Sequence, residues 1–513
     1  MEKILWADDE IDLLKPHLLF LKGKGYDVTT VSSGADALDI LDREPFSLVL
    51  LDENMPGLSG LETLSRINLN HPEIPVIMIT KSEEENIMNQ AIGNQIADYL
   101  IKPVNPNQIF LSIKKNLHST QLVAEQTSSD YRQEFTKISG LIDRADSMQE
   151  WMEIYRQLVF WELKLADTDA ALDEMLRMQK RDANSSFCKF VKRNYEKWMD
   201  MSNPDRPMMS PDIFRKKIFP LLDTGEKVCF ILIDNFRLDQ WRTIQPLCAE
   251  FFNIQEELYS TILPTSTQYA RNSIFAGLMP LQIASMFPSL WVEEDEDEGL
   301  NIHEAELIQT QIDRFRRSDK FSYHKINDSL ASDKYTARLK SLGTNHLNVV
   351  VLNFVDMLSH ARTESKMIRE LANSDAAYRS LTESWFRHSG ALDMFRRMSE
   401  LGYKVVLTTD HGTIRVDNPI KVVGDRNTNT NLRYKVGKNL NYNPKQVYEM
   451  KRPQQFGLPS PNISSTFIFA QNEDFFSYPN NYNYYVQYYT GTFQHGGISL
   501  QEMLVPLVTM EPK

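Results

Sequence analysis

The stretch Val405-Val406-Leu407-Thr408-Thr409-Asp410-His411-Gly412 decides the fold of the C-terminal half of the chain. Its apolar first part has the length and composition of a strand buried in a parallel sheet. Open α/β sheets bind ligands just beyond the carboxyl ends of such strands, which is where Asp410 and His411 stand. A carboxylate and a neutral imidazole together suit zinc or a similar divalent ion, and Gly412 allows a sharp turn beside them. The alternative is a capping Asp followed by an ordinary loop His.

The overall composition limits the class of protein. The 513 residues are enough for about three domains, and 42% hydrophobic with 24% charged residues is typical of globular chains. A net charge of -13 argues against a broad basic surface for DNA, while a local basic pocket is compatible with it. Cys188, Cys229 and Cys248 fit no metal-ligand spacing and predict buried, reduced thiols in the cytoplasm. We expect no signal peptide and no membrane span, because no apolar run is long enough.

Two predicted strands near the N-terminus end on carboxylates, Asp8-Asp9 and Asp52. Further strands over residues 76–79 and 99–101 alternate with helical segments, which predicts a flavodoxin-like doubly wound domain. Carboxylates gathered at one sheet edge repel each other unless a cation holds them, and hard oxygen ligands favour Mg²⁺.

These positions closely resemble the receiver domain of bacterial response regulators, and the resemblance covers residues 1–119. The matching residues are Asp8-Asp9, Asp52 followed by Met55-Pro56-Gly57, Thr80 and Lys102-Pro103. The resemblance implies that Asp52 is the phosphoacceptor, that Thr80 and Lys102 contact the phosphoryl group and that Tyr99 is an aromatic switch. The Mg²⁺ ligands that it implies are Asp8, Asp9, Asp52 and Asn54. It also implies a sensor histidine kinase as partner.

Residues 120–205 are predicted to form a helical bundle. Apolar residues recur at steps of three and four over residues 138–159, and a second helical pattern spans residues 172–198 with a break expected at Ala183-Asn184-Ser185. Three tryptophans at helical spacing fit a buried core better than a stacking platform for bases, namely Trp151, Trp161 and Trp198. We expect this segment to connect the domains and to contribute to dimerisation.

Within residues 206–513, other segments supply polar groups that match Asp410 and His411. The strand over residues 228–233 ends on Asp234. The strand over residues 347–352 leads to Asp356 and His360, which share one face if the turn is helical. Thr265-Ser266-Thr267 opens a helix, where free backbone N–H groups favour a phosphate, although simple capping is the commoner use of such residues. His495 before two glycines supplies another imidazole.

The order of these residues resembles the alkaline phosphatase superfamily. Asp234-Asn235-Phe236-Arg237 and His495-Gly496-Gly497 resemble its PglZ branch in particular. The resemblance implies an α/β domain with a mostly parallel sheet and a site for two zinc ions. One zinc would take Asp356, His360 and His495, and the other Asp234, Asp410, His411 and the Thr267 hydroxyl. Two such metals favour phosphoryl or phosphodiester transfer through a covalent Thr267 intermediate.

The resemblance leaves the nucleophile and the substrate contacts open. Phosphodiesterase members commonly use threonine, which favours diesters, and Thr265 and Ser266 are alternatives to Thr267. Arg237 and Arg271 are candidates for steering an anionic substrate, although an Arg near a strand end is as often a structural ion-pair partner.

The order of receiver, connector and PglZ-type domain resembles PorX-type response regulators, which are linked to type IX secretion. The first hypothesis is a cytoplasmic two-zinc phosphodiesterase that acts on nucleotide or oligonucleotide phosphodiesters. Phosphorylation of Asp52 would regulate it and favour a homodimer. The alternative is a catalytically weak, metal-stabilised signalling module that binds a secretion component or a sigma factor.

Overall fold

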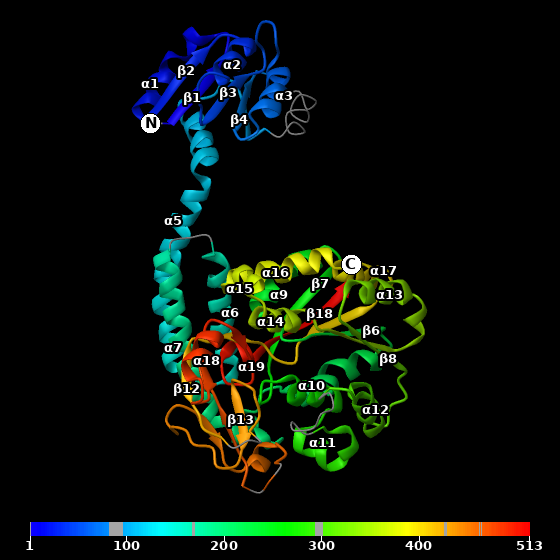
Figure 1. The fold of residues 1–513 in the computed structure, drawn as a ribbon. Coiled ribbons are helices and arrows are strands. Elements are labelled where there is room, and N and C mark those ends of the chain that lie inside the picture. Colours follow the sequence, from blue (N-terminus) through cyan, green and yellow to red (C-terminus); the bar gives the residue numbers. More distant parts are fainter. Residues whose placement is uncertain are drawn as a thin grey trace. The chain divides into compact units, whose positions relative to one another are not determined.

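The chain is described from a computed structural model, which covers residues 2–81, 96–166, 170–292, 301–424, 428–460, 462 and 464–513. It divides into two compact units, Met1–Ser129 and Asp130–Lys513 (Figure 1). The described part of the chain contains no helix that is both long and apolar enough to cross a membrane. All three cysteines are free and buried, as the sequence predicts.

The first unit is built on a five-stranded parallel sheet in the order β2-β1-β3-β4-β5. Its strands are β1 (Glu2–Ala7), β2 (Tyr26–Val31), β3 (Leu48–Asp52), β4 (Val76–Thr80) and β5 (Asp98–Ile101). One face packs against α2 (Gly34–Leu41) and α3 (Gly60–Asn70), and the other against α1 (Lys15–Gly23) and the start of α5 (Pro106–Arg144). This is the predicted doubly wound fold, and it brings the ends of β1 and β3 to one edge.

The second unit begins with the helical connector. The rest of α5 is followed by α6 (Met148–Lys164), α7 (Ala170–Asn194) and the short helix η2 (Tyr195–Met199). Trp151, Trp161 and Trp198 are buried, as predicted for core residues. The connector shares one continuous hydrophobic core with the rest of the unit.

The predicted break at Ala183-Asn184-Ser185 is wrong, because α7 runs through it without interruption. The Asn184 side chain accepts from the Leu500 backbone N–H at 2.7 Å and donates to Gln501 Oε1 at 3.0 Å. Asn184 is therefore tolerated inside the helix because its buried side-chain amide forms hydrogen bonds with the neighbouring segment that contains Leu500 and Gln501.

The C-terminal domain contains a six-stranded sheet in the order β7-β18-β10-β6-β9-β8. The strands β10, β6, β9 and β8 are parallel, and β18 is antiparallel to both β10 and β7. The carboxyl ends of β7, β10, β6 and β9 therefore meet at one edge of the sheet. The strand bounds are β6 (Val228–Ile233), β7 (Phe252–Ser260), β8 (Phe321–Ile326), β9 (Leu347–Leu352), β10 (Lys404–Thr408) and β18 (Leu504–Pro512).

Helices cover both faces of this sheet (Figure 1). One side carries α9 (Leu238–Cys248), α13 (Ser329–Arg338), α16 (Asp375–His388) and α17 (Ala391–Glu400). The other carries α10 (Thr267–Ala276), α11 (Pro280–Met286) and α12 (Glu304–Arg314). The remaining helices are η3 (Ser210–Asp212), η4 (Phe214–Ile218), α8 (Phe219–Asp223), η5 (Pro288–Leu290), η6 (Ser341–Thr344), α14 (Phe354–Glu364), α15 (Lys366–Leu371), η7 (Pro453–Phe456), α18 (Tyr482–Tyr489) and α19 (Leu500–Met503), and the first unit adds η1 (Ile11–Leu14).

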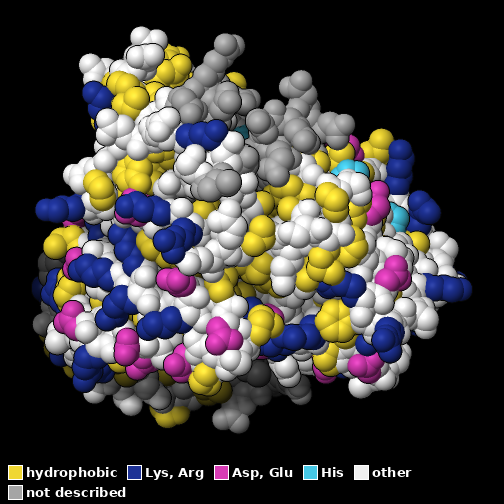
Figure 2. Space-filling model, turned by 90° about the horizontal axis from the view of Figure 1, so that it is seen from below, with side chains coloured by type: hydrophobic (Ala, Val, Ile, Leu, Met, Phe, Trp, Pro, Cys, Tyr) yellow, Lys and Arg dark blue, Asp and Glu magenta, His cyan; other side chains and the backbone are white. Residues whose placement is uncertain are grey.

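Three small sheets complete the domain. They pair β11 (Ile414–Arg415) with β17 (Phe493–Gln494), β12 (Asn418–Lys421) with β16 (Asp474–Ser477), and β13 (Tyr434–Gly437) and β14 (Tyr448–Met450) with β15 (Thr466–Phe469). On the face shown in Figure 2, the Lys and Arg side chains of the described residues are interspersed with Asp and Glu, and hydrophobic side chains lie between them.

Candidate active site

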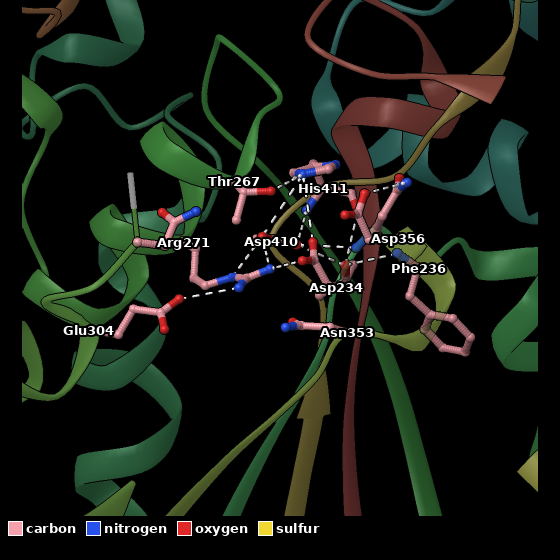
Figure 3. Close-up of polar contacts among 12 residues, drawn as sticks. Asp234, Phe236, Thr267, Arg271, Glu304, Asn353, Asp356, Asp410 and His411 are labelled. Atoms are coloured by element: carbon pink, nitrogen blue, oxygen red, sulfur yellow. Dashed lines mark hydrogen bonds and ion pairs between the residues drawn. The ribbon is translucent and has the colours of Figure 1, made fainter. Parts of the chain in front are cut away.

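The first group of polar side chains lies at the carboxyl ends of β6 and β10. Asp234 follows β6 directly, and Asp410 and His411 follow β10. Potential ligand atoms of the three residues lie within 4.8 Å of one another, and all three are buried. His411 Nε2 is 3.9 Å from Asp234 Oδ1 and 3.9 Å from Asp410 Oδ2. Figure 3 shows them facing Thr267 from the end of the sheet.

The second group joins Asp356, His360 and His495, again within 4.8 Å of one another. The segment after β9 is helical as the spacing requires, so α14 presents Asp356 and His360 on one face, with 3.5 Å between Asp356 Oδ2 and His360 Nε2. His495 follows β17, and its Nε2 is 4.0 Å from Asp356 Oδ1. The His495 ring stacks on the His411 ring with 4.2 Å between centroids, which brings the two groups side by side.

Backbone carbonyls orient both stacked imidazoles. Nδ1 of His411 lies 3.1 Å from the Gly412 carbonyl oxygen, and Nδ1 of His495 lies 3.1 Å from the Thr265 carbonyl oxygen. A carbonyl accepts only from a protonated nitrogen, so in each neutral ring Nδ1 carries the hydrogen and Nε2 keeps its lone pair. This is the arrangement in which metal-binding histidines are held.

The three hydroxyls at the start of α10 have different surroundings. Thr267 is partly exposed, and its Oγ1 is 3.2 Å from His411 Nε2. Thr265 is fully buried, donates to the Gly497 carbonyl and accepts from the Gly496 N–H, both at 2.9 Å. Ser266 is the N-cap residue of α10. The Thr265 hydroxyl is thus hydrogen-bonded to the backbone of the loop that carries His495. The Thr267 hydroxyl is the one that faces the predicted metal ligands.

A buried arginine neutralises part of the first group. Arg271 lies one turn after Thr267 on α10 and is 1% exposed. Its guanidinium pairs with Asp234, with Asp410 at 2.9 Å and with Glu304 at 3.2 Å. The network is drawn in Figure 3. Arg271 therefore faces the predicted metal ligands, and its predicted contact with substrate stays a prediction.

Burial and neighbouring charges shift the protonation of these groups. Burial raises the pKa of Asp234 well above its usual value, and the carboxylates of Asp410 and Asp356 add to this against the opposing effect of Arg271. Burial also acts to raise the pKa of Asp410, but the Arg271 guanidinium, His411 and backbone N–H donors such as that of Asn235 together outweigh burial and hold this pKa at about 2. Burial lowers the pKa of His495 well below its usual value, and His411 and His360 add to the effect.

Arg237, the other predicted substrate contact, lies in a buried ion-pair cluster. It is 2% exposed, binds Asp239 through two nitrogens at 2.9 and 2.7 Å, and binds Asp375 at 2.6 Å. This is the structural ion pair that the sequence left as the alternative, and a contact with substrate stays a prediction.

Two residues near the site were missed by the sequence reasoning. Asn235 donates from its backbone N–H to Asp410 Oδ1 and from its side chain to Asp356 Oδ1, both at 3.3 Å, so it bridges the two ligand groups. Its φ of 61° is the left-handed conformation in which asparagine is enriched. The sequence signal that could have identified Asn235 is its place directly after Asp234, the carboxylate at the end of a strand. Glu304 gave no local signal, because only the fold brings it to Arg271.

The residues present fit divalent metal ions. Asp234 Oδ1 is buried and has no hydrogen-bond partner among the described residues. A buried carboxylate oxygen without a partner is costly unless a cation faces it. Imidazole nitrogens combined with carboxylates are a donor set that suits zinc.

The edge of the first unit holds a second acidic cluster. Ligand atoms of Asp8, Asp9 and Asp52 lie within 4.8 Å of one another. Lys102 Nζ is 2.9 Å from Asp8 Oδ2 and 3.0 Å from Asp52 Oδ2, while Asp52 Oδ1 is buried without a hydrogen-bond partner among the described residues. Burial raises the pKa of Asp52, with Lys102 opposing and the carboxylates of Asp8 and Asp9 adding.

The other predicted receiver residues lie at the same edge. Thr80 ends β4 and is buried, and a hydrogen bond links it to Tyr99 on β5. Asn54 is exposed two residues after Asp52. Three oxygen donors suit Mg²⁺ better than zinc, so the fit differs from that of the C-terminal groups.

Known families match the chain in three consecutive ranges. The response regulator receiver domain matches residues 4–114. The PorX response regulator linker domain matches residues 121–199. The BREX system PglZ alkaline phosphatase-like domain matches residues 213–510, which is more than half of the 513-residue chain.

Curated relatives match the N-terminal part. The alginate biosynthesis transcriptional regulatory protein AlgB of Pseudomonas syringae pv. tomato is 31% identical over 156 residues, which are 30% of this chain and 35% of that protein. The transcriptional regulatory protein ZraR of Escherichia coli is 30% identical over 146 residues, 28% of this chain and 32% of that protein. The chain thus spans about a third of the length of these relatives.

Solved receiver domains are also similar. The CheY-like response regulator receiver domain protein of Methanospirillum hungatei is 26% identical and covers 24% of this chain and 97% of its own, with a TM-score of 0.23. The architecture is established by the order of the three family matches alone. The chain belongs to the PglZ alkaline phosphatase-like family, and it is a two-component response regulator of PorX-type architecture, in which a receiver domain and a helical linker precede the PglZ domain.

Proposed function

We propose that the PglZ domain is a two-zinc phosphodiesterase with Thr267 as nucleophile. The observation that supports this best is the meeting of two three-residue ligand groups with a threonine hydroxyl at a helix N-terminus. One ion would be held by Asp356, His360 and His495, and the other by Asp234, Asp410, His411 and Thr267. When bound, zinc supplies positive charge beside the phosphoryl group and lowers the pKa of an oxygen nucleophile.

Thr267 would carry the covalent step. Its Oγ1 forms a bond to phosphorus while the bond from phosphorus to the ester oxygen breaks, and the hydroxyl proton leaves with the departing alcohol. Water then attacks the phosphothreonine, releases a phosphomonoester and restores the hydroxyl. The backbone N–H groups in the first turn of α10 and the helix dipole stabilise the charged phosphoryl oxygens.

The substrate class that we propose is the phosphodiesters of nucleotides or oligonucleotides. Threonine at the nucleophile position resembles the phosphodiesterase members of the superfamily. Thr267 is also the only one of the three hydroxyls at the start of α10 for which a contact with a predicted ligand side chain is described.

The test is turnover of bis-para-nitrophenyl phosphate by the zinc-loaded full chain. Thr267→Ala should abolish turnover while the bound zinc, measured by metal analysis, stays the same. Ser266→Ala is the matched control, and we expect it to retain turnover. Undiminished turnover by Thr267→Ala with zinc retained would remove Thr267 from its role.

We also propose that phosphorylation of Asp52 by a sensor histidine kinase regulates this activity. The receiver domain implies such a kinase as partner. The added charge would alter the contacts of the receiver and favour a homodimer. The PorX-type architecture is what supports the further proposal of a link to type IX secretion. Chain mass measured in solution with and without acetyl phosphate tests the dimer.

A second candidate function is a metal-stabilised signalling module that binds a secretion component or a sigma factor. The pairing of Arg271 with Asp234 and Asp410 favours it, because such a network stabilises a fold without catalysis. Substrate turnover separates the candidates, since a module that only binds partners gives no turnover beyond that of an Asp410→Asn, His411→Ala double variant.

A further inference from the structure

A buried charge cluster centred on Arg237 lies beside the loops that carry the predicted ligands. Arg237 stands three residues after Asp234 in the loop that follows β6. Asp239 and Asp375 satisfy all three nitrogens of its guanidinium at 2.6 to 2.9 Å. These ion pairs therefore fix the position of the loop that carries Asp234, because a movement of Arg237 would leave buried charges without a partner.

The same guanidinium lies over two stacked aromatic rings. Its carbon is 5.3 Å from the centroid of Phe493 and 5.7 Å from that of Tyr378, and these rings stack with centroids 4.4 Å apart. Phe493 precedes His495 by two residues. The Tyr378 hydroxyl donates to the Val355 carbonyl at 2.9 Å, beside Asp356, and the Ser359 hydroxyl donates to the Phe493 carbonyl at 3.2 Å.

The Asp410-His411 loop also touches this cluster. A Cβ at Gly412 would lie 3.4 Å from Arg237 Cγ and 2.0 Å from the Gln501 carbonyl oxygen, so the backbone there passes closely between the two. The segments that carry the six predicted Asp and His metal ligands, Thr267 apart, thus converge on the Arg237 side chain and the two rings beside it.

The connector helices complete this cluster. Arg379 on α16 binds Asp239 at 3.1 Å and Glu162 on α6 at 2.6 Å. Lys180 on α7 binds the other Glu162 oxygen at 2.7 Å. The six side chains balance three positive and three negative charges, and the Glu162 side chain is 12% exposed. Glu162 is thus the negatively charged side chain that the connector contributes to this cluster.

We propose that Arg237 is a positioning residue for both predicted zinc sites and that Glu162 of the connector completes its support. This deepens the proposed function and rests on it. Because interiors are close-packed, removal of the Glu162 charge is expected to shift Arg379, Asp239 and Arg237 together and to misplace ligand side chains. The connector then contributes to the geometry of the site without touching substrate.

The main test uses Glu162→Gln in the full chain. We expect its affinity for Zn²⁺, measured by competition with a chelator, to fall about tenfold, and kcat for bis-para-nitrophenyl phosphate to fall about tenfold with little change in KM. The visible absorption of the Co²⁺-loaded chain should change, because it reports the coordination geometry. The matched control is Glu153→Gln on the same helix, where the carboxylate is exposed and pairs with Arg156.

Further variants separate positioning from simple loss of stability. Glu162→Gln combined with Lys180→Met restores the charge balance and should recover most of the Zn²⁺ affinity. Arg237→Lys should retain more of the Zn²⁺ affinity of the unaltered chain than Arg237→Met does. These two variants test the positioning role of Arg237 if Glu162→Gln does not fold. Zn²⁺ affinity and Co²⁺ absorption of Glu162→Gln equal to those of Glu153→Gln would overturn the proposal, even with a lower Tm. If the unaltered chain binds Zn²⁺ but hydrolyses no diester, only the proposed catalysis fails, because the metal readouts remain.

Discussion

The receiver and the PglZ domain each gather carboxylates at a sheet edge, but they balance the charge differently. In the receiver, Lys102 contacts Asp8 and Asp52, and Asp9 remains exposed. In the PglZ domain, Arg271 is 1% exposed and is fixed between Asp234, Asp410 and a third carboxylate, that of Glu304.

The two cations differ in how firmly their side chains are held. Lysine is a point charge on a flexible stem, whereas the guanidinium is a rigid fork that holds carboxylates in fixed directions. The Lys102 side chain can therefore change its partners more readily than that of Arg271. The PglZ site keeps its charge in place and presents a fixed set of donors.

Removal of the Asp52 carboxylate from the receiver should have a greater effect than any other change considered below. Asp52→Ala should abolish labelling by acetyl phosphate, because Asp52 Oδ1 is the buried oxygen of that cluster for which the described part of the chain offers no hydrogen-bond partner. Asp12→Ala, which removes an exposed carboxylate, should label normally. Mass spectrometry of the treated chains measures both. Labelling that persists in Asp52→Ala would mean that another residue is the acceptor.

The next effect concerns the two counter-cations. Arg271→Met without zinc should lower the free energy of unfolding of its unit by about 3–5 kcal/mol, because it leaves Asp234 and Asp410 buried and uncompensated. Saturating zinc should restore part of this, since a ligand that binds the folded state stabilises it.

Lys102→Met should cost its own unit less, roughly 1–3 kcal/mol, because Lys102 makes two charge-assisted hydrogen bonds at a more open site. Urea unfolding followed separately for each unit compares the two. Equal losses would contradict the distinction between a fixed and a movable cation.

Much of this comparison could be predicted from sequence, because it depends on local patterns. Apolar strands ending on Asp52, Asp234 and Asp410 indicated both sheet edges, and the four-residue spacing of Asp356 and His360 indicated a helical face. One partner of each arginine was not predictable, because Glu304 reaches Arg271 and Asp375 reaches Arg237 only through tertiary packing. Asn184 misled for the same reason, since its local preference for a break is outweighed by a contact with Leu500.

A smaller effect separates the two threonines that flank the N-cap of α10. Thr265→Val should lower the free energy of unfolding by roughly 1–3 kcal/mol, because the Gly496 N–H and the Gly497 carbonyl both lose a buried partner. Diester turnover should remain measurable in this variant and be absent in Thr267→Val. Complete loss of turnover in Thr265→Val at full zinc occupancy would argue for Thr265 as nucleophile.

A further, minor effect concerns the N-terminal cap of a receiver helix. Ser59 forms a capping box with Glu62 at the start of α3 in the receiver. Ser59→Ala should lower the stability of that unit by about 1 kcal/mol and leave Zn²⁺ binding by the PglZ domain unchanged. Circular dichroism during thermal unfolding and chelator competition measure the two quantities.

The place of β18 in the sheet has a consequence for synthesis on the ribosome. It follows every other strand of the large sheet along the chain, yet it lies between β7 and β10 in space. Until β18 has been translated, the neighbours that it will join expose unpaired backbone groups, a state prone to wrong pairing. His495 emerges only shortly before β18, so the nascent chain acquires the last of its predicted ligands and the last strand of this sheet at nearly the same moment.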